Sequence, residues 1–228
     1  MKNVISFSLW GYDPRYTHGA IHNIDLAKKL YPDWICRFYI DPNNSPPDIV
    51  QKIIESGSEI VYRDNNRDTL GMMWRFEVMF DKKVDKFLIR DADSRIYYRE
   101  VVAVNEWIAS GKGFHVMRDN PHHSGAILGG MWGGKTSCCM EYENIYNSYI
   151  NNPDIPVVRG SDQEFLWKYI WPNIKQNTLC HDSCKTYGGC DGAELMFTVP
   201  LENNLFVGGV IDPNETGLDA YSKYTKEL

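Results

Sequence analysis

A chain of 228 residues with 43% hydrophobic side chains can bury one sizeable core, so we expect a single domain over residues 1–228. The formal net charge of −6 and the pI near 5.5 argue against binding to nucleic acid or to an anionic membrane surface, because both select basic faces. The first residues turn polar too soon for a signal peptide, and no apolar run reaches membrane-spanning length. This pattern favours a cytoplasmic protein without membrane insertion.

The first half of the chain alternates short apolar runs with segments of helical periodicity. We expect strands over residues 4–9, 35–40, 59–63 and 86–90. Helices are expected from about residue 20 to 30, over 47–56, over 70–80 and around 101–108. Strands and helices that alternate in this way predict βαβ units, and therefore an α/β fold with a mainly parallel central sheet flanked by helices.

The second half of the chain is less regular. Residues 113–117 and 126–131 are expected to form strands, and Ser161 to Glu164 has the pattern of a capping box that opens an amphipathic helix. A polar segment that includes His122 follows the first of these strands, and it has two interpretations. It is either a solvated loop, or a place where Arg118 and Asp119 contact hydroxyl groups of a donor or acceptor sugar.

Two carboxylates follow the strand expected at residues 86–90. In an open α/β sheet, ligands bind beyond the carboxyl ends of the strands. Asp91 and Asp93 are two residues apart in an extended segment, so both side chains can point the same way and bind one hard cation, Mn²⁺ or Mg²⁺. The flanking Arg90 and Arg95 suit phosphate oxygens, because a guanidinium group can bind two oxygens at once. The alternative is an acidic pair that only solvates a loop.

Residues Gly129 to Thr136 fit the phosphate-loop pattern G-x-x-x-x-G-K-T and follow an apolar run. This pattern would make the protein a nucleotide triphosphatase or a kinase. Against it, Met131 and Trp132 occupy the middle of a loop whose backbone must wrap closely around phosphates. The other interpretation is a glycine-rich turn that places Trp132 over a sugar ring at the edge of the sheet.

Six cysteines in a chain of this length do not make a disulfide scaffold, and we expect them to be mostly reduced. Cys180, Cys184 and Cys190 surround His181, which raises a structural zinc site as one interpretation. Their spacings lack the paired two-residue knuckles of common zinc sites. A buried, hydrogen-bonded histidine is another interpretation.

Together these segments resemble GT-A-type glycosyltransferases, in particular a little-characterised group of bacterial and viral transferase-like proteins. The resemblance covers roughly residues 4 to 212, and it rests on the combination of motifs rather than on any one of them. The motifs are Ile5–Gly11, Trp74–Phe76, Ile89–Arg95 with its DADSR sequence, Arg99–Glu100, His115–Asp119, Gly129–Gly133 and Ser161–Leu166. The cysteine-rich stretch from Cys180 to Cys190 is not part of the pattern.

The resemblance implies a one-domain GT-A fold, which is Rossmann-like, in which Asp91 and Asp93 form the metal-binding Asp-x-Asp motif. Asp162 matches the acidic residue that faces the acceptor in other transferases of this fold, and His181 fits the late histidine that often completes the metal shell. The nucleotide is expected at the loop after the first strand. The full set of expected donor-binding residues is Leu9, Trp10, Gly11, Tyr16, Arg75, Arg90, Arg95, Arg118, Asp119, Gly130 and Trp132.

The sequence therefore predicts a metal-dependent glycosyltransferase that moves a sugar from a nucleoside diphosphate sugar to a hydroxyl acceptor on a glycan. Asp162 is the expected general base if the reaction inverts the sugar's configuration, and it positions the acceptor if the configuration is retained. Two other classes stay open at this point. One is a P-loop enzyme that uses Gly129–Thr136, and the other is a non-catalytic sugar- or metal-binding module.

Overall fold

The computed structural model describes residues 1–64, 70–123, 125–155, 158–184, 193–201 and 205–211. Within these residues, eight strands form one sheet in the order β3-β2-β1-β4-β6-β5-β7-β8. The strands are β1 (Lys2–Leu9), β2 (Trp34–Ile40), β3 (Glu59–Tyr62), β4 (Val84–Arg90), β5 (Phe114–Arg118), β6 (Met131–Lys135), β7 (Thr178–Asp182) and β8 (Ala193–Leu195). All neighbouring strands pair in parallel except β6, which runs antiparallel to both β4 and β5.

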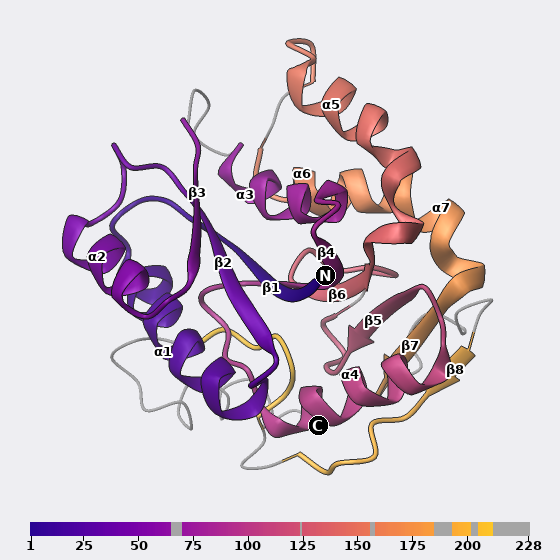
Figure 1. The fold of residues 1–228 in the computed structure, drawn as a ribbon. Helices are drawn as coiled ribbons and strands as arrows, with labels where there is room; N and C mark the ends of the chain where they lie inside the picture. The colour runs from indigo at the N-terminus through magenta and orange to yellow at the C-terminus, as the bar shows by residue number, and fades with distance from the viewer. Residues whose placement is uncertain (65–69, 124, 156–157, 185–192, 202–204, 212–228) are drawn as a thin grey trace.

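Helices cover both faces of this sheet (Figure 1). On one face lie α1 (Pro14–Leu30), α2 (Pro47–Glu55) and α4 (Tyr98–Ser110), packed on a core that includes Phe7 and Phe38. A second core, which includes Phe76 and Trp132, fills the other face. The elements there are α3 (Gly71–Trp74), the 3₁₀ helix η1 (Arg75–Phe80), α5 (Glu143–Asn151), α6 (Ser161–Phe165), the π-helix η4 (Leu166–Ile170) and α7 (Trp171–Ile174).

Three short 3₁₀ helices complete the described elements: η2 (Thr136–Cys138), η3 (Met140–Tyr142) and η5 (Lys175–Asn177). None of the helices in the described parts of the chain is both long and apolar enough to cross a membrane. The predicted α/β fold with a mainly parallel sheet is confirmed.

Several element boundaries differ from the prediction. Helix α1 begins at Pro14 rather than near residue 20, because Asp13 caps it and its side chain accepts a hydrogen bond from the Arg15 amide. The segment 70–80 is not one helix but α3 followed by η1. Ser161 is the first residue of α6 and not its cap, since the cap position belongs to Gly160 with φ +92°.

The phosphate-loop interpretation of Gly129–Thr136 is wrong. Residues 126–130 form no strand, whereas Met131 to Lys135 form β6, hydrogen-bonded to strands on both sides. Extended backbone inside a sheet cannot wrap around phosphates. The ammonium group of Lys135 donates to the Gly111 carbonyl at 2.8 Å, at the end of β6 remote from Gly130.

Candidate functional site

A cleft of about 760 Å³ lies beyond the carboxyl ends of β1 and β4. The loop after β1 contributes Trp10 and Gly11, the first turn of α1 contributes Tyr16, and the loop after β4 contributes Asp91 and Asp93. Further walls come from the turn before β6, from the start of α6 and from the segment 205–211 near the C-terminus. A sheet-edge cleft of this kind is the usual ligand site of open α/β folds.

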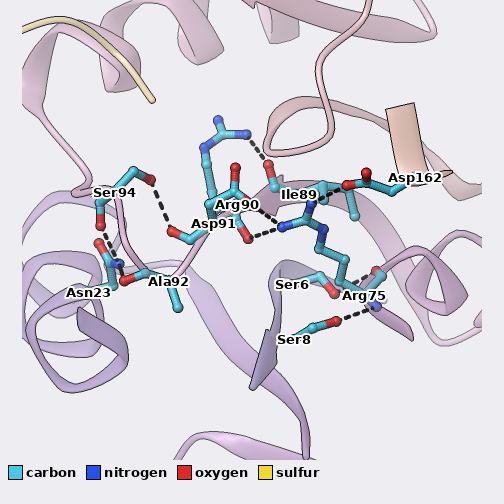
Figure 2. Close-up of polar contacts among 10 residues, drawn as sticks. All are labelled: Ser6, Ser8, Asn23, Arg75, Ile89, Arg90, Asp91, Ala92, Ser94 and Asp162. Atoms are coloured by element: carbon cyan, nitrogen blue, oxygen red, sulfur yellow. Dashed lines mark hydrogen bonds and ion pairs between the residues drawn. The ribbon is translucent and has the colours of Figure 1, made fainter. Parts of the chain in front are cut away.

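Arg75 lines the cleft and lies between two carboxylates, those of Asp91 and Asp162 (Figure 2). Its backbone is fixed by β1: the Ser6 hydroxyl donates to the Arg75 carbonyl at 2.7 Å, and the Arg75 amide donates to the Ser8 hydroxyl oxygen at 3.0 Å. The guanidinium group donates to an Asp162 oxygen at 2.8 Å and to an Asp91 oxygen. The buried Arg75 is therefore bonded both to Asp91, a candidate metal ligand, and to Asp162, the residue expected to face the acceptor.

The loop that carries Asp91 and Asp93 is held by α1 and by its own turn. The Asn23 side chain donates to the Ser94 carbonyl at 2.8 Å, and the Ser94 hydroxyl donates to the Asp91 carbonyl at 3.0 Å (Figure 2). The Ile211 amide donates to the Asp93 carbonyl at 2.9 Å. These bonds fix the backbone from several sides, so both carboxylates are presented to the cleft by ordered structure.

Two carboxylates of the cleft, those of Asp93 and Asp162, carry perturbed pKa values. Burial raises the pKa of Asp93 to about 6, and the negative charge of Asp91 adds to this shift. Burial also raises the pKa of Asp162, while the neighbouring Arg75 partly offsets the effect. Like charges are crowded here in a partly dehydrated site, an arrangement that is frequent at functional sites.

Two glycines let the chain pass close to these acids. A Cβ atom at Gly130 would lie 1.9 Å from an Asp91 carboxylate oxygen, and one at Gly129 would lie 2.4 Å from an Asp162 carboxylate oxygen. The backbone can occupy this space only because neither residue has a side chain. The absence of side chains at Gly129 and Gly130 thus leaves room for the carboxylates of Asp162 and Asp91, and not for phosphate groups.

Eight of the residues expected from the sequence line the cleft, and seven do not. Those that line it are Trp10, Gly11, Tyr16, Arg75, Asp91, Asp93, Gly130 and Asp162. Those outside it are Leu9, Arg90, Arg95, Arg118, Asp119, Trp132 and His181. Leu9 is a core residue on the α1 side of the sheet, with 1% of its surface exposed.

The three outlying arginines have structural partners. Arg90 donates to Glu100 at 3.0 Å, and both side chains are 2% exposed. Arg118 donates to Asp182 at 2.7 Å, and both side chains are 1% exposed. Arg95 donates to the carbonyls of Ala92 and Ser94. The expectations that Arg90 and Arg95 face phosphate oxygens and that Arg118 contacts a sugar hydroxyl group are therefore corrected.

Asp119 is likewise occupied, because Arg99 holds its carboxylate at 2.6 Å and the Val207 amide donates to it at 3.0 Å. Trp132 is fully buried, with its ring edge-on to Phe76 at 5.8 Å and to Phe87 at 5.3 Å. It is a core residue of the sheet and not a sugar-stacking platform.

His181 does not lie beside Asp93. Its ring nitrogens are 2.8 Å from His115 Nε2 and 2.7 Å from a Glu106 oxygen, so neither is available to a cation in the cleft. Cys180 is disulfide-bonded, which removes it from a zinc site; the other cysteines of the described residues are reduced, in line with the expectation that most are. Cys36, Cys138, Cys139 and Cys184 are free, and Cys190 lies outside the described residues.

Sequence reasoning missed several residues of the cleft, among them Asp13, His123, Arg159 and Gln163. Asp13 had a detectable signal, because Asp followed by Pro is typical of a helix start beside a sheet edge. His123 lies next to His122 in a polar segment whose sequence alone does not indicate which side chain lines a cleft. Arg159 lies in an irregular segment before α6, where no periodic pattern indicates which way a side chain points.

The sheet and its cleft define the class of fold as GT-A. A mannosyltransferase from Pyrobaculum calidifontis, solved with GDP-Man and Mn²⁺, superposes with a TM-score of 0.51 at 10% identity, over 79% of this chain and 55% of its own. A glycosyltransferase involved in glycosylation of the major capsid of PBCV-1 gives 0.47 at 14% identity, over 80% and 82%. A 4-diphosphocytidyl-2C-methyl-D-erythritol synthase from Anaerococcus prevotii gives 0.47 at 11% identity, over 72% and 84%.

No protein-family model and no curated protein sequence matches the chain. At these identities the likeness to solved structures concerns the fold alone. The GT-A fold implied by the sequence resemblance is confirmed by the superposition on the mannosyltransferase. The chemistry has to be argued from the cleft itself.

Proposed function

We propose that the protein transfers a sugar from a nucleoside diphosphate sugar to a hydroxyl group of a glycan, with Mn²⁺ or Mg²⁺ bound at Asp91 and Asp93. The charge of the cleft carries this proposal. Among the described residues, its lining sets two guanidinium groups against four carboxylates, those of Asp13, Asp91, Asp93 and Asp162. A diphosphate would be repelled by such a cleft unless a cation accompanied it.

Asp91 and Asp93 fit the requirements of a hard divalent cation. Both supply oxygen ligands. Burial and, after it, the negative charge of Asp91 raise the pKa of Asp93, so a cation would relieve an existing repulsion. The described residues contain no group of three side chains able to hold a metal. We infer that the protein contributes these two carboxylates while phosphate oxygens and water complete the shell, as Mg²⁺ sites with bound phosphates commonly do. When bound, such a cation supplies Lewis-acid stabilisation of the departing diphosphate.

The chain's own residues orient the reactants around this position. The loop from Trp10 to Gly11 and the Tyr16 ring form the wall that receives the nucleotide. Asp162 faces the cleft from the start of α6, and Arg75 fixes its carboxylate at 2.8 Å. In this position Asp162 accepts the acceptor's proton if the sugar's configuration inverts, and it orients the hydroxyl group if the configuration is retained.

The fold supports the same assignment. The mannosyltransferase whose fold this chain shares was solved with GDP-Man and Mn²⁺. A net negative charge of −6 over the whole chain gives no support to a nucleic-acid partner. The expected partners are therefore a nucleotide-sugar donor and a hydroxyl-bearing glycan acceptor.

Titration calorimetry against UDP-, GDP- and dTDP-sugars, each with and without Mn²⁺, tests the proposal. We expect at least one donor to bind in the presence of Mn²⁺ and to bind far more weakly in its absence. Release of free nucleoside diphosphate from that donor would show turnover. Metal-dependent binding with no turnover toward water or glycan acceptors would indicate a binding module, and no donor binding at all would refute the proposal.

A further inference from the structure

We propose that Arg159 is the residue that meets the phosphate groups of an incoming ligand in this cleft. The inference rests on the proposed function for the identity of the ligand, a nucleoside diphosphate. It rests on the structure for the residue, because among the described residues two arginines, Arg75 and Arg159, line the cleft, and Arg75 is already ion-paired.

Arg75 cannot serve an incoming anion without losing its present partners. Its guanidinium group holds Asp91 and Asp162 at once, and the residue is 6% exposed. Pulling it toward a phosphate would leave two carboxylates without their cation. Arg75 is therefore a structural clamp between the two acidic sites.

Arg159 differs from every other arginine in the described residues. The others hold a carboxylate or a backbone carbonyl: Arg15, Arg37, Arg63, Arg75, Arg90, Arg95, Arg99 and Arg118. Arg159 is exposed, lines the cleft and makes no ion pair or hydrogen bond with any described residue. It can turn toward a ligand without breaking an existing contact.

Arg159 lines the same cleft as the acidic pair, Asp91 and Asp93, and as Tyr16. Burial is the main cause that raises the pKa of the Tyr16 phenol, and the charges of Asp93, Arg15, Asp91 and Arg159 also act on it, in keeping with this shared cleft. A diphosphate held against a cation at Asp91 and Asp93 would therefore occupy the cleft that Arg159 also lines.

The chemistry of the side chain favours a phosphate over a neutral sugar. A guanidinium group donates two parallel hydrogen bonds to phosphate oxygens, and such charge-assisted bonds are about twice as strong as neutral ones. The phosphate could belong to the donor's diphosphate or to a phosphorylated acceptor. We assign it to the donor, because the acidic pair that needs a cation lines the same cleft as Arg159.

Calorimetry with Mn²⁺ and the tightest-binding nucleoside diphosphate, on the wild type, Arg159→Ala and Arg159→Lys, tests the assignment. We expect Arg159→Ala to weaken binding by about tenfold or more, and Arg159→Lys to recover part of the loss. Mn²⁺ affinity measured without nucleotide should not fall. Lys52→Ala is the matched control, since it removes one positive charge from an exposed residue of α2 outside the cleft.

Further arms use Mn²⁺ with inorganic pyrophosphate, the corresponding nucleoside, and glycerol phosphate. Loss of pyrophosphate and diphosphate binding with unchanged nucleoside binding supports the assignment. Equal affinity of the wild type and Arg159→Ala for the diphosphate overturns the assignment. A loss of affinity confined to glycerol phosphate also overturns it, because that result would place Arg159 on the acceptor side. If the wild type binds pyrophosphate but no nucleotide, the proposed function is refuted, and pyrophosphate binding by Arg159→Ala alone decides whether Arg159 binds phosphate groups. If it binds neither, both are refuted.

Discussion

At the scale of single residues, a side chain's role here depends on whether it lies inside a strand or just beyond its end. Arg90 is the last residue of β4 and pairs with the buried Glu100, whereas Asp91 follows in the loop and lines the cleft. The sequence showed where the strand ends, and this placed Asp91 and Asp93 correctly at the sheet edge. It did not show that Arg118 would pair with Asp182, because that partner lies 64 residues further along the chain.

The acidic pair gives the first prediction. Asp91→Asn or Asp93→Asn should abolish Mn²⁺-dependent nucleotide binding, because each change removes an anionic oxygen ligand from a site with few ligands. The circular dichroism spectrum should not change. Asp85→Asn, at an exposed position of β4, is the control and should bind as the wild type does. Unchanged Mn²⁺-dependent affinity in both site variants would refute the metal site.

Asp93 also allows a prediction about pH and stability. Its folded pKa of about 6 lies above the unfolded value of about 3.9, so the folded state binds the extra proton between these values. The contribution of Asp93 to stability is therefore present below about pH 4 and lost as pH rises through about 6. In metal-free buffer, Asp93→Asn should become more stable relative to the wild type across this window, by on the order of 2 kcal/mol.

Urea denaturation of both proteins in the presence of a chelator measures this difference. A stability difference that stays constant between about pH 4 and about pH 7 would contradict it. Added Mn²⁺ should reverse the order, because only the wild type retains both carboxylates for the cation.

Asp162 carries the third prediction. Asp162→Asn should lower turnover at least about a hundredfold, on the scale of general-base removal. The melting temperature should fall little, because Arg75 keeps Asp91 as a charged partner and Asn still offers an oxygen. Loss of a helix cap does not contribute to the change in melting temperature, since Gly160 and not Asp162 occupies the cap position of α6. Near-normal turnover in a steady-state assay would reduce Asp162 to a structural partner of Arg75.

At the scale of elements, the glycine-rich segment 129–136 shows how a local pattern can mislead. Its spacing matches a phosphate loop, but that motif needs a loop between a strand and a helix. Here Gly133 and Gly134 lie in β6, where a Cβ at Gly133 would meet the Phe87 carbonyl at 2.5 Å. The glycines permit close strand packing, and no feature of the segment alone separates this role from phosphate binding.

Two substitutions distinguish these roles. Gly130→Ala should eliminate metal-dependent nucleotide binding, because its Cβ would collide with the Asp91 carboxylate at 1.9 Å. Lys135→Ala should leave binding unchanged, because that ammonium group bonds the Gly111 carbonyl away from the cleft. Calorimetry on both variants is the measurement. A phosphate loop would give the opposite result for Lys135→Ala.

At the scale of the whole molecule, strand order explains why His181 does not reach the acidic pair. The family resemblance implies that this histidine completes a metal shell with Asp91 and Asp93. In the sheet, however, β6 and β5 separate β7 from β4. Alternation of strands and helices predicts the fold class, but the order of late strands depends on packing between distant segments. The mainly parallel sheet was therefore predictable, whereas the neighbours of β7 were not.

His181 instead belongs to a buried network with His115 and Glu106, and this network gives the last prediction. Burial is the main cause that lowers the pKa of both histidines. At His181, Glu106 and Asp119 raise the pKa and so partly oppose the effect of burial, whereas Arg99 lowers it further. At His115, Arg90 also lowers the pKa. If His181 Nε2–H donates to Glu106, then His115 Nε2–H donates to His181, and both rings are neutral.

Unfolded histidine binds a proton below about pH 6.5, whereas these folded rings resist it. The folded state should therefore lose stability as pH falls below about 6.5, by at most about 1.4 kcal/mol per pH unit for each histidine. Asp93 acts in the opposite direction at lower pH, so the measurement belongs in the Asp93→Asn background. Urea denaturation from about pH 7.5 to about pH 5.5 should show the decline, and His181→Gln should make it shallower. In the Asp93→Asn background, a free energy of unfolding that stays level or rises on acidification would contradict this prediction. It would show that His115 and His181 accept protons in the folded state as readily as in the unfolded chain.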